Sequence, residues 1–177
     1  RDSYVKRDRV GLIAFRDTVG EVVVPPTGSA SQAAMQLTWL ASGGTTPLSI
    51  GLFAAVKTLE MEQVRDPARK AILVLITDGR ANVAYFGGEP LEEAVKIAKT
   101  IRKMGITSLV IDADRMVAGP AALRSAMEAT QKSARTRGIF SDGPARTVAD
   151  AMGAKYFSLA EMSRSAILKA IRSRMAL

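Results

Sequence analysis

The sequence predicts an α/β fold with a doubly wound, mostly parallel sheet and helices on both faces. The expected strands are apolar throughout rather than alternating, as in residues 10–15 (VGLIAF) and 71–77 (AILVLIT). Such runs are typical of strands buried on both faces. They are separated by longer segments with apolar residues at helical spacing. The expected elements are a strand over 10–15, a strand over 21–24 closed by two prolines, a helix ending near 40, a helix over about 47–62, a strand over 71–77, a helix over about 90–104, a strand over 107–111, helices over 121–134 and 147–152, a strand over 155–159 and a helix over 163–175.

Capping residues support several of these boundaries. Ser29 or Ser31 is a suitable N-cap for the first helix. Thr46 is a natural N-cap for the second helix, with Pro47 at its first position. Gly105 suits the C-terminal end of the helix over 90–104. We expect one domain over 1–177, with an insertion at about 114–146, where the pattern weakens.

Composition excludes several classes of function. The chain has no cysteine and no histidine, so thiolate and imidazole chemistry are excluded and any metal must be a hard cation held by oxygen. Its longest apolar run, 71–76, is far shorter than the roughly 20 residues of a membrane-spanning helix. The first nine residues are polar and charged, so no signal peptide is visible.

The chain carries a net charge of +8, with 25 basic and 17 acidic residues. This excess favours acidic partners. The basic residues are scattered, and aromatic residues, at 5%, are too few for an obvious base-stacking platform. We therefore favour a solvated basic surface or a protein-docking face over nucleic-acid binding, and nucleic-acid binding stays an alternative for the basic segment 114–146.

Candidate ligands follow the ends of the expected strands, where open parallel sheets bind their ligands. Asp78 comes directly after the strand over 71–77, and Thr46 ends a glycine-rich loop before a helix. A carboxylate and a hydroxyl, completed by water, make a sensible partial shell for Mg²⁺. Both residues also have structural explanations, as a turn residue and an N-cap. Asp112 is interpreted as a strand-end turn residue rather than a ligand.

Four motifs occur in order: DRVGLIAF at 8–15, VPPT at 24–27, GGTTPL at 43–48 and TDGRANV at 77–83. Together they resemble the von Willebrand factor A domains of magnesium chelatase D subunits. The resemblance covers about 8–111 and resumes at 149–159.

The resemblance implies a metal-ion-dependent adhesion site. In this family the site combines an Asp-x-Ser-x-Ser loop after the first strand, a threonine loop and an aspartate after the fourth strand. By motif, Thr46 rather than Thr45 takes the threonine role, and Asp78 takes the aspartate role. The Asp-x-Ser-x-Ser loop is absent from the 177 residues, so the implied Mg²⁺ site is incomplete. The expected rim of the site, which would face a partner, is formed by Gly44, Thr45, Arg80 and Asn82.

The family's first strand is also absent, and its place in the sheet lies between 10–15 and 71–77. Without it, both apolar strands would expose unpaired backbone groups. Each such buried group costs about 1–3 kcal/mol, against a net stability of about 5–15 kcal/mol. A stable monomer in the family's arrangement is therefore not expected. Either a preceding segment or another chain supplies the strand, or the sheet closes differently.

The resemblance implies a non-catalytic, Mg²⁺-dependent interaction domain that supports ATP-dependent insertion of Mg²⁺ into protoporphyrin IX for chlorophyll or bacteriochlorophyll. The implied partners are the ATPase I subunit and the porphyrin-binding H subunit, with ATP bound by the rest of the complex. The implied location is the bacterial cytoplasm or the chloroplast stroma. Alternatives are a cobalt-chelatase or other chaperone-like subunit of the same type, and a phosphate- or nucleotide-binding enzyme. The latter would use 43–46 as an anion cradle, with Asp112 or Asp78 as metal ligand.

Overall fold

The computed structural model describes residues 8–40, 43–113 and 143–158. These residues form two compact units, one of 8–40, 43–69 and 81–97 and another of 70–80, 98–113 and 143–158. The elements are β1 (Val10–Arg16), β2 (Val19–Thr27), α1 (Ala30–Trp39), α2 (Leu48–Arg65), β3 (Ile72–Thr77), α3 (Pro90–Lys103), β4 (Thr107–Asp112), α5 (Pro144–Met152) and β5 (Lys155–Ser158). No helix in the described ranges is long and apolar enough to cross a membrane.

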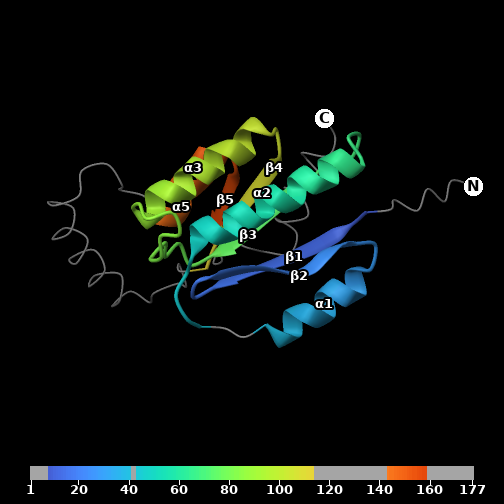
Figure 1. Ribbon diagram of the computed structural model, residues 1–177, viewed down its shortest axis with the longest axis horizontal. Coiled ribbons are helices and arrows are strands. Elements are labelled where there is room, and N and C mark those ends of the chain that lie inside the picture. The colour runs from blue at the N-terminus through green and yellow to red at the C-terminus, as the bar shows by residue number, and fades with distance from the viewer. Residues whose placement is uncertain (1–7, 41–42, 114–142, 159–177) are drawn as a thin grey trace, which may run out of the picture. The chain divides into compact units, whose positions relative to one another are not determined.

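The first unit is built on an antiparallel hairpin of β1 and β2. Helices α1 and α2 lie on opposite sides of this hairpin (Figure 1). Two glycines allow α2 to approach it closely. A Cβ atom at Gly51 would lie 2.5 Å from the ring of Phe15, and one at Gly20 would lie 2.5 Å from the side chain of Ile50. The apolar side of α2 is buried there, including Leu48 and Leu52.

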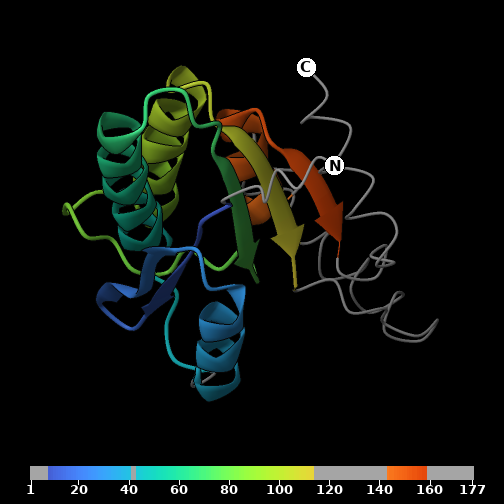
Figure 2. The same cartoon turned by 90° about the vertical axis from the view of Figure 1, so that its right-hand side faces the viewer.

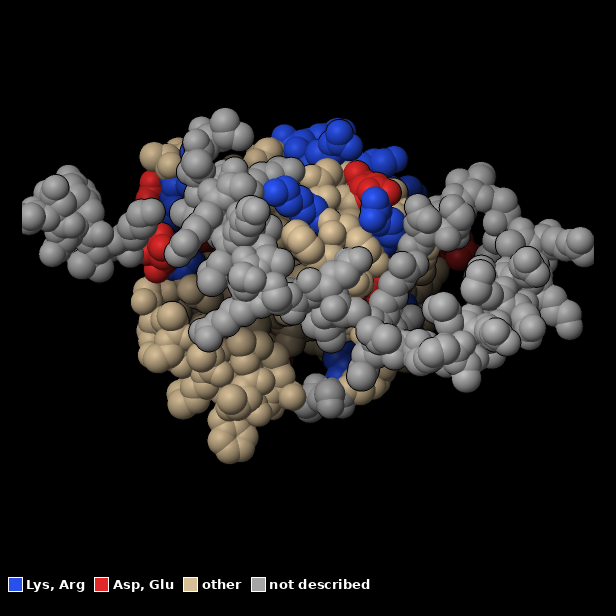
Figure 3. Space-filling view, turned by 180° about the vertical axis from the view of Figure 1, so that it is seen from behind, with Lys and Arg blue, Asp and Glu red and all other residues tan. Residues whose placement is uncertain are grey.

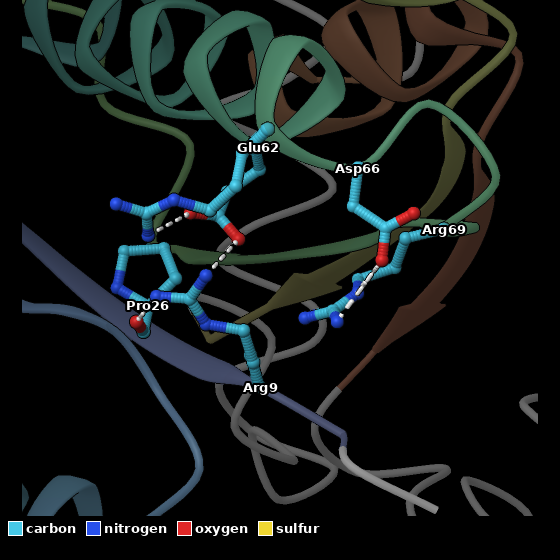
Figure 4. A network of polar contacts seen from close by, with 6 residues as sticks. Arg9, Pro26, Glu62, Asp66 and Arg69 are labelled. Atoms are coloured by element: carbon cyan, nitrogen blue, oxygen red, sulfur yellow. Dashed lines mark hydrogen bonds and ion pairs between the residues drawn. The ribbon is translucent and has the colours of Figure 1, made fainter.

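Polar contacts hold the far end of α2 to the hairpin (Figure 4). Arg9, just before β1, forms an ion pair of 2.9 Å with Glu62 of α2 and donates a hydrogen bond to the carbonyl oxygen of Pro26 in β2. Beyond the helix, Asp66 and Arg69 form an ion pair of 3.1 Å. The Arg9 contacts join three elements of the unit around one guanidinium group.

Helix α1 is less buried than α2, with Ala33 as its buried residue. It has no charged residue, and the end of the molecule that it forms shows neither blue nor red in Figure 3. Its Trp39 is 79% exposed and its Met35 is 56% exposed. The sequence therefore leaves an uncharged apolar surface on this helix.

The second unit contains a parallel sheet in the order β3-β4-β5 (Figure 2). The register pairs Ile72 with Thr107 and Thr77 with Asp112. Helix α5 packs against β4 and β5. Leu109 and Val110 of β4 and Val148 and Met152 of α5 are buried.

The predicted fold class is confirmed: the described chain is α/β, with a parallel sheet and accompanying helices. Within the described ranges, β1 pairs with β2 alone and β3 with β4 alone, so the strands form two separate sheets. Ser29 is confirmed as the N-cap of α1, because its hydroxyl accepts the N–H of Gln32.

Several predicted boundaries are wrong. β2 does not end at residue 24 but continues through both prolines to Thr27. The register shifts there, from Leu12 opposite Val24 to Val10 opposite Thr27, and such an irregularity accommodates prolines, which cannot donate to the ladder. Helix α5 begins at Pro144 rather than 147, and α2 ends at Arg65 rather than near 62.

Thr46 is not the N-cap of α2. The helix begins at Leu48, and Pro47 holds the cap position without a side-chain hydrogen bond.

The expected helices over 121–134 and 163–175 lie outside the described residues, as do Leu159 and most of the expected insertion. The expectation of a single domain stays a prediction.

Candidate functional site

The loop before α2 (residues 43–46, the threonine loop) has a shape that requires glycine. Gly43 and Gly44 have φ angles of +102° and +93°. A Cβ atom at Gly44 would also lie 2.4 Å from Oδ1 of Asp17, whereas one at Gly43 would meet nothing within 4 Å. A side chain at residue 44 would therefore strain the backbone and collide with the tip of the β1–β2 hairpin.

Asp17, at that tip, holds the threonine loop through three hydrogen bonds. Its backbone N–H donates to the carbonyl oxygen of Thr45 at 2.9 Å. In return, the N–H of Thr45 donates to Oδ1 of Asp17 at 3.2 Å, and the Thr45 hydroxyl donates to the Asp17 carbonyl oxygen at 3.0 Å. The hydroxyl of Thr45 thus helps to fix the loop that carries Thr46.

Asn82 lies beside Thr46. Its side-chain Oδ1 accepts the backbone N–H of Thr46 at 3.0 Å. The structure therefore brings together four of the residues predicted from sequence: Gly44, Thr45, Thr46 and Asn82. The N–H groups of Thr45 and Thr46 both donate to side chains, and these are groups that a phosphate cradle at this loop would need.

Sequence reasoning missed Glu93, which holds the loop that carries Asn82. This α3 side chain is only 5% exposed, and its carboxylate accepts the N–H groups of Tyr85, Phe86 and Gly88 at 2.8, 2.9 and 2.8 Å. Burial raises the pKa of Glu93, but these bonds and the hydroxyl of Ser49 outweigh it, so the pKa lies below its ordinary value. The sequence pattern that could have indicated Glu93 is an acidic residue in the first turn of a helix that follows a Gly-Gly pair.

The second unit carries the other candidate ligand, Asp78, in a tight turn after β3 (residues 77–80, the aspartate loop). The hydroxyl of Thr77 accepts the N–H of Gly79 at 3.1 Å, and Oδ1 of Asp78 accepts the N–H of Arg80 at 3.0 Å. The Arg80 guanidinium lies 3.8 Å from the same carboxylate. Gly79 has a φ of +76° and lies against Ala145, so the turn fits closely on α5.

Asp112 ends β4 at the same edge of the sheet, because the register places it opposite Thr77. It is 7% exposed, and its carboxylate accepts a hydrogen bond from the hydroxyl of Tyr156 in β5. The next residue, Ala113, donates its N–H to the carbonyl oxygen of Thr77. Asp112 thus contributes to the packing of this strand end.

The two candidate ligands supply a hydroxyl and a carboxylate, which are oxygen donors of the kind that Mg²⁺ prefers. No group of three or more Asp, Glu, His or Cys residues that could hold a metal occurs in the described part of the chain. A magnesium ion held by these ligands would need further oxygen ligands, from water or from other protein groups, to complete its six-coordinate shell. Thr46 belongs to the first unit and Asp78 to the second, and their shared site stays a prediction.

Comparison with known proteins shows which fold the chain shares. Residues 2–80 match the family model described as the von Willebrand factor type A domain. The crystal structure of a conserved hypothetical protein, BatB, from Bacteroides thetaiotaomicron has the same fold, with a TM-score of 0.60 and 18% sequence identity, covering 97% of this chain and 80% of that one. The chain therefore has the fold of von Willebrand factor type A domains, and its residues 2–80 are similar in sequence to that family.

Two curated relatives are similar to this chain in sequence. The magnesium-chelatase 60 kDa subunit of Cereibacter sphaeroides is 38% identical over 72% of this chain and 23% of its own length. The uncharacterized protein Rv2850c of Mycobacterium tuberculosis is 38% identical over 64% of this chain and 18% of its own length. The chain thus spans about a fifth of the length of these relatives.

Proposed function

We propose that the chain is a non-catalytic, Mg²⁺-dependent interaction domain of a D-type subunit of a magnesium chelatase. The single observation that carries this proposal is that the threonine loop brings Gly44, Thr45 and Thr46 together with Asn82, four of the residues that the motif predicts. The Thr45 hydroxyl donates to the Asp17 carbonyl oxygen, and Oδ1 of Asn82 accepts the backbone N–H of Thr46. The similarity to a magnesium-chelatase subunit over 72% of the chain supports the choice of complex.

In this proposal the Thr46 hydroxyl and the Asp78 carboxylate hold Mg²⁺, directly or through water. The ion supplies an open coordination position that accepts a carboxylate from a partner protein. Asn82 and Arg80 lie next to the ligands, Asn82 through its bond to the Thr46 N–H and Arg80 through its contact with Asp78. They form the rim that orients the incoming carboxylate, together with Gly44 and Thr45.

The partners proposed here are the ATPase I subunit and the porphyrin-binding H subunit. The complex would use ATP, bound outside this domain, to insert Mg²⁺ into protoporphyrin IX in chlorophyll or bacteriochlorophyll synthesis. Its place would be the bacterial cytoplasm or the chloroplast stroma. A cobalt-chelatase subunit is the nearest alternative, and a panel of porphyrin and corrin substrates and metals distinguishes the two.

The test uses the full-length protein with Asp78→Ala, and Asp150→Ala as a matched control. Asp150 is an exposed carboxylate of α5 whose partner is Arg146. We expect Asp78→Ala to abolish Mg²⁺-dependent association with the ATPase subunit and to reduce chelatase activity at least tenfold, because a water that replaces the carboxylate ligand supplies no negative charge to hold the ion. Asp150→Ala should leave both unchanged. Unchanged association and activity in Asp78→Ala would overturn the proposal.

A further inference from the structure

Three aromatic side chains meet on the surface of the first unit: Phe53 of α2 with Tyr85 and Phe86 of the loop before α3 (the aromatic patch). The rings of Phe53 and Phe86 meet edge to face at 5.8 Å, and those of Tyr85 and Phe86 at 5.0 Å. Tyr85 is 57% exposed and Phe86 is 59% exposed. The sequence has only five phenylalanines, three tyrosines and one tryptophan, so this clustering is notable for the chain.

The patch is held rigidly. The carboxylate of Glu93 accepts the backbone N–H groups of Tyr85 and Phe86 themselves, so both rings start from a fixed main chain. Phe53 lies within an 18-residue helix. Rigid, exposed aromatic side chains lose little conformational entropy on binding, and aromatic residues are enriched among the residues that dominate interface energies.

The patch and the rim of the proposed metal site share one loop. Asn82, which bonds Thr46, precedes Tyr85 by three residues in the same loop, a span of at most about 11 Å. A partner segment bound at an ion near Thr46 needs to extend only a few residues to reach the patch. Two charged side chains lie close to the patch: the Glu93 carboxylate, which is buried and bonded to the backbone N–H groups of Tyr85 and Phe86, and Lys57, which lies 5.6 Å from the Phe53 ring and is paired with Glu60 at 2.9 Å. The patch thus suits an apolar side chain rather than a charged one.

We propose that the aromatic patch is a second contact for the partner whose carboxylate completes the proposed Mg²⁺ site. It receives an apolar side chain that lies within about four residues of that carboxylate in the partner's sequence. The inference rests on the proposed function for the identity of the partner. It goes further by assigning residues outside the ion site and by stating the chemistry that they recognise.

The test measures the affinity of the full-length protein for the purified ATPase subunit, in Mg²⁺ and in EDTA. The variants are Phe86→Ala, Asp78→Ala and the control Trp39→Ala, which removes an aromatic ring of even greater exposure from α1. We expect Phe86→Ala to weaken association about tenfold or more in both buffers, with Mg²⁺ affinity unchanged. Trp39→Ala should change affinity less than twofold.

The outcomes separate the two proposals. If Asp78→Ala weakens association and Phe86→Ala does not, the patch is not a contact and the proposed function stands. If Asp78→Ala has no effect, the proposed function and the patch's link to a metal-bound carboxylate both fail. A photo-crosslinking benzophenone side chain at position 86 keeps an aromatic ring there and avoids any loss of folding. It should capture the ATPase subunit, whereas the same group at position 39 should not, and equal capture would overturn the inference.

Discussion

The two candidate ligand loops are held in different ways. The threonine loop depends on residues far away in sequence, since Thr45 bonds to Asp17 and Thr46 bonds to Asn82, 28 and 36 positions away. The aspartate loop holds itself, because Thr77 and Asp78 each accept an N–H from a residue two positions on. The position of Thr46 therefore depends on the tertiary structure of its unit, whereas the turn at Asp78 is stabilised largely by hydrogen bonds within the turn itself.

The largest effect on the threonine loop is expected from adding a side chain at Gly44. Gly44→Ala combines a positive φ with a collision against Asp17, and we expect it to lower the free energy of unfolding by about 3 kcal/mol. Gly43→Ala is the matched control. It has a similar φ but open space around its Cβ, so its cost should be about 1 kcal/mol. Chemical denaturation of the full-length protein measures both. Equal losses would show that the contact with Asp17 does not shape the loop.

A smaller effect is expected from acid, acting through Glu93. Because the pKa of Glu93 is lowered in the folded protein, its contribution is present above the ordinary carboxyl pKa and is lost as pH falls through the lowered value. Hydrogen exchange of the N–H groups of Tyr85, Phe86 and Gly88, corrected for intrinsic rates, should therefore lose protection below about pH 4.

Glu93→Gln separates this carboxylate from other acid effects. The variant should show reduced protection at these three amides already at neutral pH, and no further loss that depends on residue 93 on acidification. The Gly79 amide, bonded to the Thr77 hydroxyl, should be unaffected by the substitution. Full protection of all three amides in Glu93→Gln would contradict the role given to the carboxylate.

The sequence predicted what depends on local patterns. Continuous apolar runs located β3 and β4, and Ser29 was found as a cap because its hydroxyl bonds within its own helix turn. The aspartate loop belongs to the same class. The threonine loop was not predicted correctly from its local pattern. Thr46 matched an N-cap pattern, but its N–H bonds to Asn82 and helix α2 begins two residues later.

Long-range contacts explain the remaining errors. Two prolines ordinarily close a strand, but the irregular pairing opposite β1 lets β2 continue past them. The role of Asp17 was invisible, and that of Glu93 was marked only by its place in the first turn of α3, because each accepts backbone N–H groups whose positions are fixed only in the folded unit. Backbone partners carry no residue signature, so no motif records them.

Magnesium binding by threonine variants tests the central claim most directly. The account predicts that Thr46→Val in the full-length protein weakens Mg²⁺ affinity, measured by calorimetry, at least tenfold, since it removes the proposed hydroxyl ligand while preserving shape. Thr45→Val removes the hydrogen bond to the Asp17 carbonyl oxygen and should change Mg²⁺ affinity far less. Equal affinities for the wild type and Thr46→Val, or a larger loss in Thr45→Val, would contradict the assignment of Thr46 to the ion.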